Sequence, residues 1–138
     1  MSDVYVIDTS ALIAFLADEE GADKVELLLS AASRYEKKVY IHRLNILEIY
    51  YLTLREEDEK KAHLMHEFVS KLPAEILEYI DEQLIEEAGR IKARYNVSLA
   101  DSVVLATASQ KHAQLVSADR GSFEDINKAG KIQFYWIR

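Results

Sequence analysis

The stretch VYVIDTSALIAFL, residues 4–16, decides the fold that we expect for this chain. Its first residues are mostly β-branched or aromatic, which is typical of a short strand, and ALIAFL then continues as an apolar helix. Asp8 stands at the junction, so we expect its carboxylate at the carboxyl end of a central strand. In open parallel sheets, this is the edge at which ligands bind.

The same alternation of strand and helix continues to the end of the chain. Short apolar segments predict five strands, over residues 4–8, 39–41, 74–77, 114–117 and 132–136. Apolar residues spaced three and four apart predict helices over residues 11–16, 22–36, 44–55, 59–72, 81–95 and 99–111. Asp81 and Ser98 mark two of the helix starts. Strands that alternate with helices favour an α/β fold, in which helices cover both faces of a mainly parallel sheet.

Length and composition favour a single domain over residues 1–138. The chain has room for one sizeable core but not for two, since a domain typically takes roughly 100–200 residues. Its 49% hydrophobic and 30% charged residues, with only one proline and four glycines, exclude a disordered or collagen-like chain. The absence of cysteine excludes disulfides and zinc ribbons.

The sequence also bears on location and on partners. The apolar N-terminal stretch is interrupted by Asp8, and no Lys or Arg precedes it, so we expect a cytoplasmic protein without a membrane span. A formal net charge of −7 opposes non-specific binding of nucleic acid, because Lys and Arg supply most of that affinity. Any binding of nucleic acid must therefore be local or metal-assisted.

Four acidic residues occupy positions where a soluble protein does not ordinarily place them. Asp8 and Asp119 both follow predicted strands, so they belong to the same edge of the sheet. Glu48 lies within IHRLNILEIYYL, a helix so apolar on every side that we expect this carboxylate to be largely buried. Asp101 shares a helix face with apolar residues and points toward the sheet. A lone buried carboxylate is costly, so we expect the acids to meet and to share a cation.

Three of these acids also have ordinary structural explanations. Asp8 can cap the helix that follows it, and Asp119 stands before Arg-Gly as a turn residue would. Asp101 completes a Ser-x-x-Asp capping box with Ser98. Taken singly, these roles explain the three residues better than a binding site does. Glu48 has no such explanation, so the four together make the stronger case for a site.

The chemistry of the donors indicates the cation. Converging carboxylates repel one another, and several remain ionised together only where cations compensate them. Oxygen donors, without cysteine or histidine among them, select hard ions such as Mg²⁺ or Mn²⁺. Two such ions can activate water and stabilise the leaving oxygen of a phosphodiester.

Four segments in order carry a resemblance to a known family: VIDTSALIAFL, NILEIYYL, SLADSVVLATA and LVSADRGSFEDI. They resemble the motifs of PIN-domain ribonucleases, most of all the VapC-type toxins of toxin–antitoxin pairs, and the resemblance spans nearly the whole chain. It implies a three-layer α/β/α sandwich with a five-stranded parallel sheet, and endonucleolytic cleavage of RNA with Mg²⁺ or Mn²⁺. It also implies a homodimer and an inhibitory antitoxin partner. The residues that it carries over are the catalytic, metal-binding acids Asp8, Glu48, Asp101 and Asp119, and the orienting hydroxyls of Ser10 and Ser117.

Other functions and sites remain open at this stage. The domain could be a PIN-fold interaction module with weak catalysis, or a housekeeping RNA-processing nuclease. A haloacid-dehalogenase-like phosphatase is excluded, because Ser10 stands where that family needs a second aspartate. We expect a solvated surface role for Arg43 and Arg120 rather than RNA contact. Two further roles stay open: metal binding by His63 and His66, and base stacking, a protein interface or core packing by Tyr50 and Tyr51.

Overall fold

The structure, a computed structural model, describes residues 3–138 and is built around a five-stranded sheet. Its strands are β1 (Val4–Ile7), β2 (Lys38–His42), β3 (Glu75–Leu77), β4 (Gln114–Ser117) and β5 (Phe134–Trp136). They lie in the order β3-β2-β1-β4-β5, and every neighbouring pair is parallel. The predicted parallel sheet with β1 at its centre is therefore confirmed.

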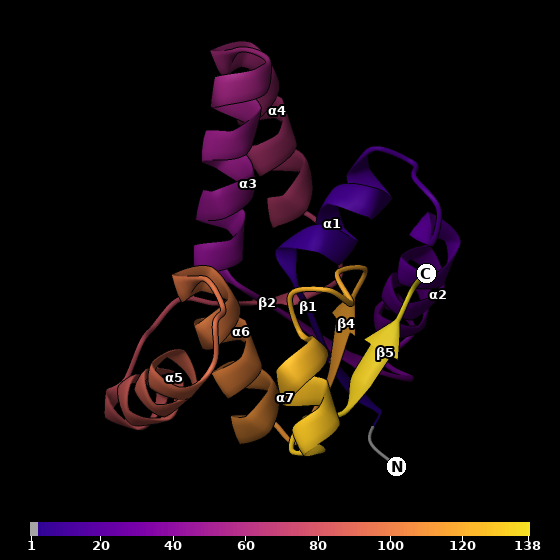
Figure 1. Cartoon of the computed structure of the whole chain (residues 1–138). Coiled ribbons are helices and arrows are strands. Elements are labelled where there is room, and N and C mark those ends of the chain that lie inside the picture. The colour runs from indigo at the N-terminus through magenta and orange to yellow at the C-terminus, as the bar shows by residue number, and fades with distance from the viewer. Residues whose placement is uncertain (1–2) are drawn as a thin grey trace.

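Helices cover both faces of the sheet, which makes the predicted α/β/α sandwich (Figure 1). Alternate residues of a strand point to opposite faces. Accordingly, Tyr5 and Ile7 of β1 belong to the core that the first helices cover, whereas Val6 belongs to the core under the last three. The helices are α1 (Thr9–Leu16), α2 (Ala22–Ser33), α3 (Arg43–Glu56), α4 (Glu59–Ser70), α5 (Glu82–Arg94), α6 (Leu99–Gln110) and α7 (Glu124–Ala129). Within residues 3–138, none is long and apolar enough to cross a membrane.

Two features of this architecture position the site. First, α3 and α4 form a hairpin that extends beyond the sheet, at the top of Figure 1. Second, α3 contacts both α1 and α6, so the helices that follow β1, β2 and α5 meet above the carboxyl ends of the central strands. Residues far apart in the sequence are thereby brought to one edge of the sheet.

The sequence-based boundaries differ from the structure by up to three residues, and one helix was missed. Helix α1 begins at Thr9, two residues earlier than predicted, because the Asp8 side chain accepts a hydrogen bond from the Ala11 N–H and caps it there. The predicted starts at Asp81 and Ser98 are confirmed as helix caps. Helix α7 has only six residues, too few to produce a recognisable helical period.

Candidate active site

Asp8 joins β1 to α1 and is almost fully buried. Its backbone N–H donates to the Val116 carbonyl at 3.0 Å, which extends the pairing of β1 with β4 by one residue. Its carboxylate accepts hydrogen bonds from the Ala11 N–H and from the Ser10 hydroxyl, both at 2.8 Å. With 2% of the residue exposed, burial raises the pKa of Asp8 from 3.8 to about 6, although hydrogen bonds from Ser117, Ala11 and Ser10 oppose that rise. The capping residue is therefore also a desolvated acid at the ligand-binding edge of the sheet.

The two serines expected to orient the acids lie between Asp8 and the segment that carries Asp119. The Ser10 hydroxyl lies 3.3 Å from that of Ser117 and accepts a hydrogen bond from the Ala118 N–H at 2.9 Å. The Ser117 hydroxyl accepts from the Asp119 N–H at 3.1 Å and also hydrogen-bonds Asp8. The hydroxyls thus connect the ends of β1 and β4, and they fix the backbone on which both aspartates sit.

Asp101 lies in the first turn of α6 and interacts electrostatically with the three other acids. The capping box predicted for it is present, since its N–H donates to the Ser98 hydroxyl at 3.1 Å. Burial raises the pKa of Asp101, hydrogen bonds from Ser98 lower it, and the charges of Glu48 and Asp119 raise it further. The charge of Asp101 in turn raises the pKa of Asp8. Asp8, Glu48 and Asp119 therefore each lie within electrostatic range of Asp101.

Glu48 is partly buried on α3, less completely than expected for a carboxylate within so apolar a helix. The physical reason is the hairpin: because α3 projects beyond the sheet, one of its sides faces solvent, and Leu47 and Tyr51 are 57% and 46% exposed. Among residues 3–138 the Glu48 carboxylate has no hydrogen bond and no ion pair. It remains close enough to Asp101 for mutual repulsion.

Asp119 is exposed and is also the turn residue that the sequence suggested. Its carboxylate accepts from the Ser122 N–H at 3.2 Å and from the Ser122 hydroxyl at 2.6 Å. These bonds keep the side chain within its own turn. A ligand that used Asp119 would have to share its oxygens with Ser122 or displace that residue.

The donor set suits a hard divalent cation. It consists of carboxylate oxygens alone, with serine hydroxyls behind them, as Mg²⁺ and Mn²⁺ prefer. Burial and like charge both raise the pKa of Asp101, and a cation would offset the second of these effects. In the described part of the chain, no three acidic or histidine side chains lie close enough together to enclose one ion. The acids are therefore near neighbours rather than a closed coordination sphere.

Sequence reasoning missed one polar pair beside these acids. Asn45 of α3 is completely buried, and its amide donates to the hydroxyl of the buried Thr9 at 2.8 Å. Thr9 follows Asp8, and Asn45 lies three residues before Glu48. The available signal was the one that identified Glu48, namely a polar side chain within an apolar helix.

Three side chains that were considered as RNA contacts or metal ligands interact with other residues of the chain. Arg43 forms an ion pair with Glu78 at 2.9 Å. The Arg120 guanidinium lies 4.9 Å from the centre of the Trp136 ring and donates to the carbonyl of the last residue. His63 lies 3.3 Å from the hydroxyl of Tyr50 on the outer side of the hairpin.

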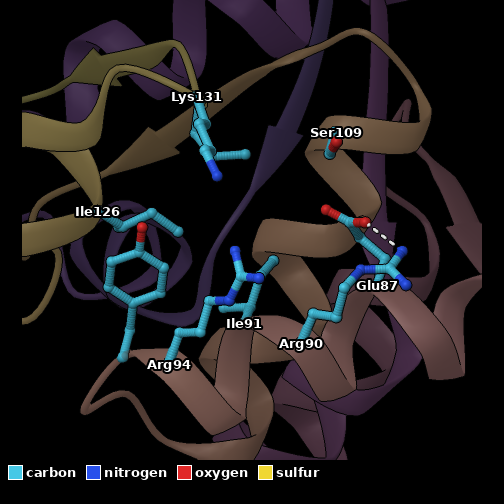
Figure 2. Close-up of a pocket in the computed structure, with 9 residues that line it drawn as sticks. Glu87, Arg90, Ile91, Arg94, Ser109, Ile126 and Lys131 are labelled. Carbon is cyan, nitrogen blue, oxygen red and sulfur yellow. Dashed lines mark hydrogen bonds and ion pairs between the residues drawn. The ribbon is translucent and has the colours of Figure 1, made fainter.

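A pocket of about 220 Å³ lies at the opposite end of α6 (Figure 2), and none of the four acids lines it. Arg94 and Lys131 point into it, whereas Arg90 turns aside to pair with Glu87. Ser109, in its wall, is about 12 Å along α6 from Asp101, at 1.5 Å per residue. The helices α5, α6 and α7 all end here, and cations at such ends neutralise exposed carbonyl groups.

Comparisons with known proteins agree with this fold. The model of the PIN domain family matches residues 5–129. Among solved structures, DNA-bound VapBC from Salmonella typhimurium is similar, with a TM-score of 0.74, 19% identity and 100% of both chains covered. VapBC-5 of Mycobacterium tuberculosis, a member of the VapBC family of toxin–antitoxin systems, has a TM-score of 0.65 and 16% identity, with 97% of this chain and 98% of that chain covered.

A third similar structure is that of VapC20 from Mycobacterium tuberculosis, described as a sarcin–ricin loop cleaving toxin. Its TM-score is 0.64 at 17% identity, with 91% of this chain and 95% of that chain covered. No curated protein sequence matches the chain. At these identities the solved structures establish the fold alone, whereas the family model shows that residues 5–129 carry the sequence pattern of that family.

Proposed function

Because the chain belongs to the PIN domain family, we propose that it is a Mg²⁺- or Mn²⁺-dependent endoribonuclease and the toxin of a toxin–antitoxin pair. The observation that carries the proposal is that Asp8, Glu48 and Asp119, from three other segments, each lie within electrostatic range of Asp101, beside the carboxyl edge of a parallel sheet. The similarity of fold to a toxin described as cleaving the sarcin–ricin loop supports RNA as the substrate class.

The proposed roles follow from where each side chain lies. Asp8, Glu48, Asp101 and Asp119 would hold the ion or ions. When bound, a divalent cation neutralises charge on the phosphoryl oxygens and lowers the pKa of the attacking water. Ser10 and Ser117 keep the carboxylate of Asp8 and the backbone of Asp119 in place through the hydrogen bonds described above. No side chain needs to act as a nucleophile.

The proposal is tested by cleavage of structured RNAs with Mg²⁺ or Mn²⁺, comparing the wild type with Asp101→Asn. We expect the variant to lose roughly 100-fold or more of the rate, because it removes a charge from the centre of the cluster. Asp81→Asn is the matched control, since Asp81 caps α5 as Asp8 caps α1 but lies outside the cluster. Its rate should equal that of the wild type.

The outcomes of this assay separate the alternatives. Cleavage that persists in Asp101→Asn would point to a contaminating nuclease. A wild type that cleaves no RNA under any of these conditions would favour an interaction module. If the protein cleaves RNA and no antitoxin gene lies beside its own gene, a housekeeping nuclease is favoured.

An apolar groove between α1 and the α3–α4 hairpin supports the antitoxin part of the proposal. It has a volume of about 900 Å³, and Leu16, Leu52 and Met65 are among its lining residues. Leu64 and Phe68 on its rim are 56% and 50% exposed, which is unusual for such large apolar side chains. A groove of this kind suits the apolar face of an amphipathic helix. We propose that an antitoxin segment covers it.

Replacing Phe68 with glutamate is expected to weaken antitoxin binding by 10-fold or more, because a charge would replace an exposed apolar anchor, where losses of about 2 kcal/mol are common. The probe is the product of a short reading frame adjacent to this gene, where one is found, and binding is measured by co-purification and calorimetry. Leu27→Glu is the control, since Leu27 is 66% exposed on α2, outside the groove. Equal weakening by both variants would argue against the groove, and RNA cleavage by the free Phe68→Glu protein should be unchanged.

A further inference from the structure

One buried hydrogen bond joins the two helices that carry Asp8 and Glu48. The Asn45 amide nitrogen on α3 donates to the Thr9 hydroxyl on α1 at 2.8 Å. Asn45 is 0% exposed and Thr9 is 9% exposed, so water does not compete for this bond. Thr9 is adjacent to Asp8, and Asn45 lies one helical turn before Glu48 on a similar face of α3. The bond therefore connects the segment that carries Asp8 to the helix that carries Glu48.

Asn45 is costly for the fold as it stands. Its amide oxygen is buried and has no hydrogen-bond partner within the described residues. A buried polar atom without a partner destabilises a protein, whereas replacing both members of a buried polar pair by apolar residues of the same shape is nearly neutral or stabilising. The neighbours Ile46 and Ile49 belong to the apolar core, so a leucine in this position would suit its surroundings. Stability therefore does not explain an asparagine here.

The position of Asn45 between α1 and α3 explains why an asparagine stands there. The remaining contacts between α1 and α3 are largely apolar packing, which resists separation of the helices but fixes their relative translation only weakly. A hydrogen bond is directional and loses its strength when its donor and acceptor shift. Asp101 of α6 interacts electrostatically with both Asp8 and Glu48, so both residues that the bond holds face the same third acid.

We infer that Asn45 is a positioning residue, which holds α1 against α3 through Thr9 and so sets the separation of Asp8 and Glu48. The inference rests on the proposed metal-dependent function. A displacement of about 1 Å in reacting groups can cost roughly 100-fold in rate. Replacing a group that supports metal ligands without touching the metal typically weakens metal binding by about 10- to 100-fold.

The test uses variants that delete the hydrogen bond but keep the shape of the side chain. Asn45→Leu removes the donor, Thr9→Val removes the acceptor, and Thr9→Ser keeps the hydroxyl and is the matched control. The measurements are kcat and KM for RNA cleavage, the affinity for Mn²⁺ without RNA by electron paramagnetic resonance, and the unfolding temperature without metal.

We expect Asn45→Leu and Thr9→Val to lower kcat by about 10- to 100-fold with little change in KM, and to weaken Mn²⁺ binding about 10-fold. Thr9→Ser should stay near the wild type in all three measurements. Each single deletion leaves one buried partner without its hydrogen bond, so the unfolding temperature of the double variant Thr9→Val/Asn45→Leu, which leaves neither, should equal or exceed that of the wild type. The double variant should be no worse than the worse single variant, because one bond is lost in each case.

Several results would overturn the inference. Unchanged kcat and Mn²⁺ affinity in both deletion variants would show that the bond positions nothing. A fall in the unfolding temperature of the double variant in parallel with kcat would assign Asn45 a structural role only, and Thr9→Val decides the matter if the variants that contain Asn45→Leu do not fold. A wild type that neither binds Mn²⁺ nor cleaves RNA would overturn the proposed function, and the inference with it.

Discussion

Replacing Asp8 with asparagine is expected to abolish RNA cleavage and, without divalent cations, to make the folded protein more stable at pH 7. The loss of cleavage, by roughly 100-fold or more, follows from removal of a proposed metal ligand. The gain in stability follows from burial. Asparagine is as good a helix cap as aspartate, so α1 keeps its start, while the desolvated charge disappears.

The sign of the stability change comes from the pKa of Asp8. The folded state raises this pKa from 3.8 to about 6, so the native protein binds the proton more tightly than the unfolded chain does. The free energy of unfolding therefore falls as the pH rises from about 4 to 6, and the full penalty is present above that window. At roughly 1.4 kcal/mol per pKa unit, the penalty that Asp8→Asn removes is on the order of 2–3 kcal/mol.

The measurement is urea unfolding in EDTA at pH 7, 5 and 4. The advantage of Asp8→Asn over the wild type should be largest at pH 7, smaller at pH 5 and nearly absent at pH 4. Asp81→Asn provides the comparison, because Asp81 is an exposed cap with the same hydrogen bond to its helix. Its stability should match the wild type throughout. If Asp8→Asn destabilises the protein equally at every pH, burial does not control this carboxylate.

The sequence predicted the fold well because the relevant signals are local. A strand that ends in aspartate and leads into an apolar helix, as at Asp8, determines both the secondary structure and the edge on which the acid lies. The same holds for Asp101, whose capping box with Ser98 places it in the first turn of α6. Parallel strands then bring such ends together without further information from the sequence.

The features that sequence reasoning missed depend on tertiary placement. The bond between Thr9 and Asn45 joins residues of two different helices, and nothing near either residue signals the partner. Glu48 is partly exposed because the α3–α4 hairpin projects beyond the sheet, and the apolar pattern of its helix does not reveal that projection. The Arg120 guanidinium lies over the ring of Trp136, which belongs to the last strand. Helix periodicity and strand pattern carry no information about contacts between residues far apart in the sequence.

Adding Mn²⁺ is expected to raise the unfolding temperature of the wild type at pH 7.5, and to have little effect at pH 5. A ligand that binds only the folded state at 100 times its dissociation constant contributes about 2.7 kcal/mol, which for a chain of this size corresponds to roughly 5–10 °C. The dependence on pH arises because protons and the cation compete for carboxylates. With a pKa near 6, Asp8 is ionised at pH 7.5 and mostly protonated at pH 5.

The same thermal shift separates a specific site from loose attraction to an acidic protein. With a net charge of −7, the protein attracts cations everywhere, but such binding is weak and is screened by salt. The shift should therefore persist in 0.5 M KCl, disappear in Asp101→Asn and remain in Asp81→Asn. Mg²⁺ should act as Mn²⁺ does at higher concentration, since both take oxygen ligands. A shift that survives in Asp101→Asn, or that is the same at pH 5 and 7.5, would place the cation outside the acid cluster and would remove the physical basis for the proposed nuclease.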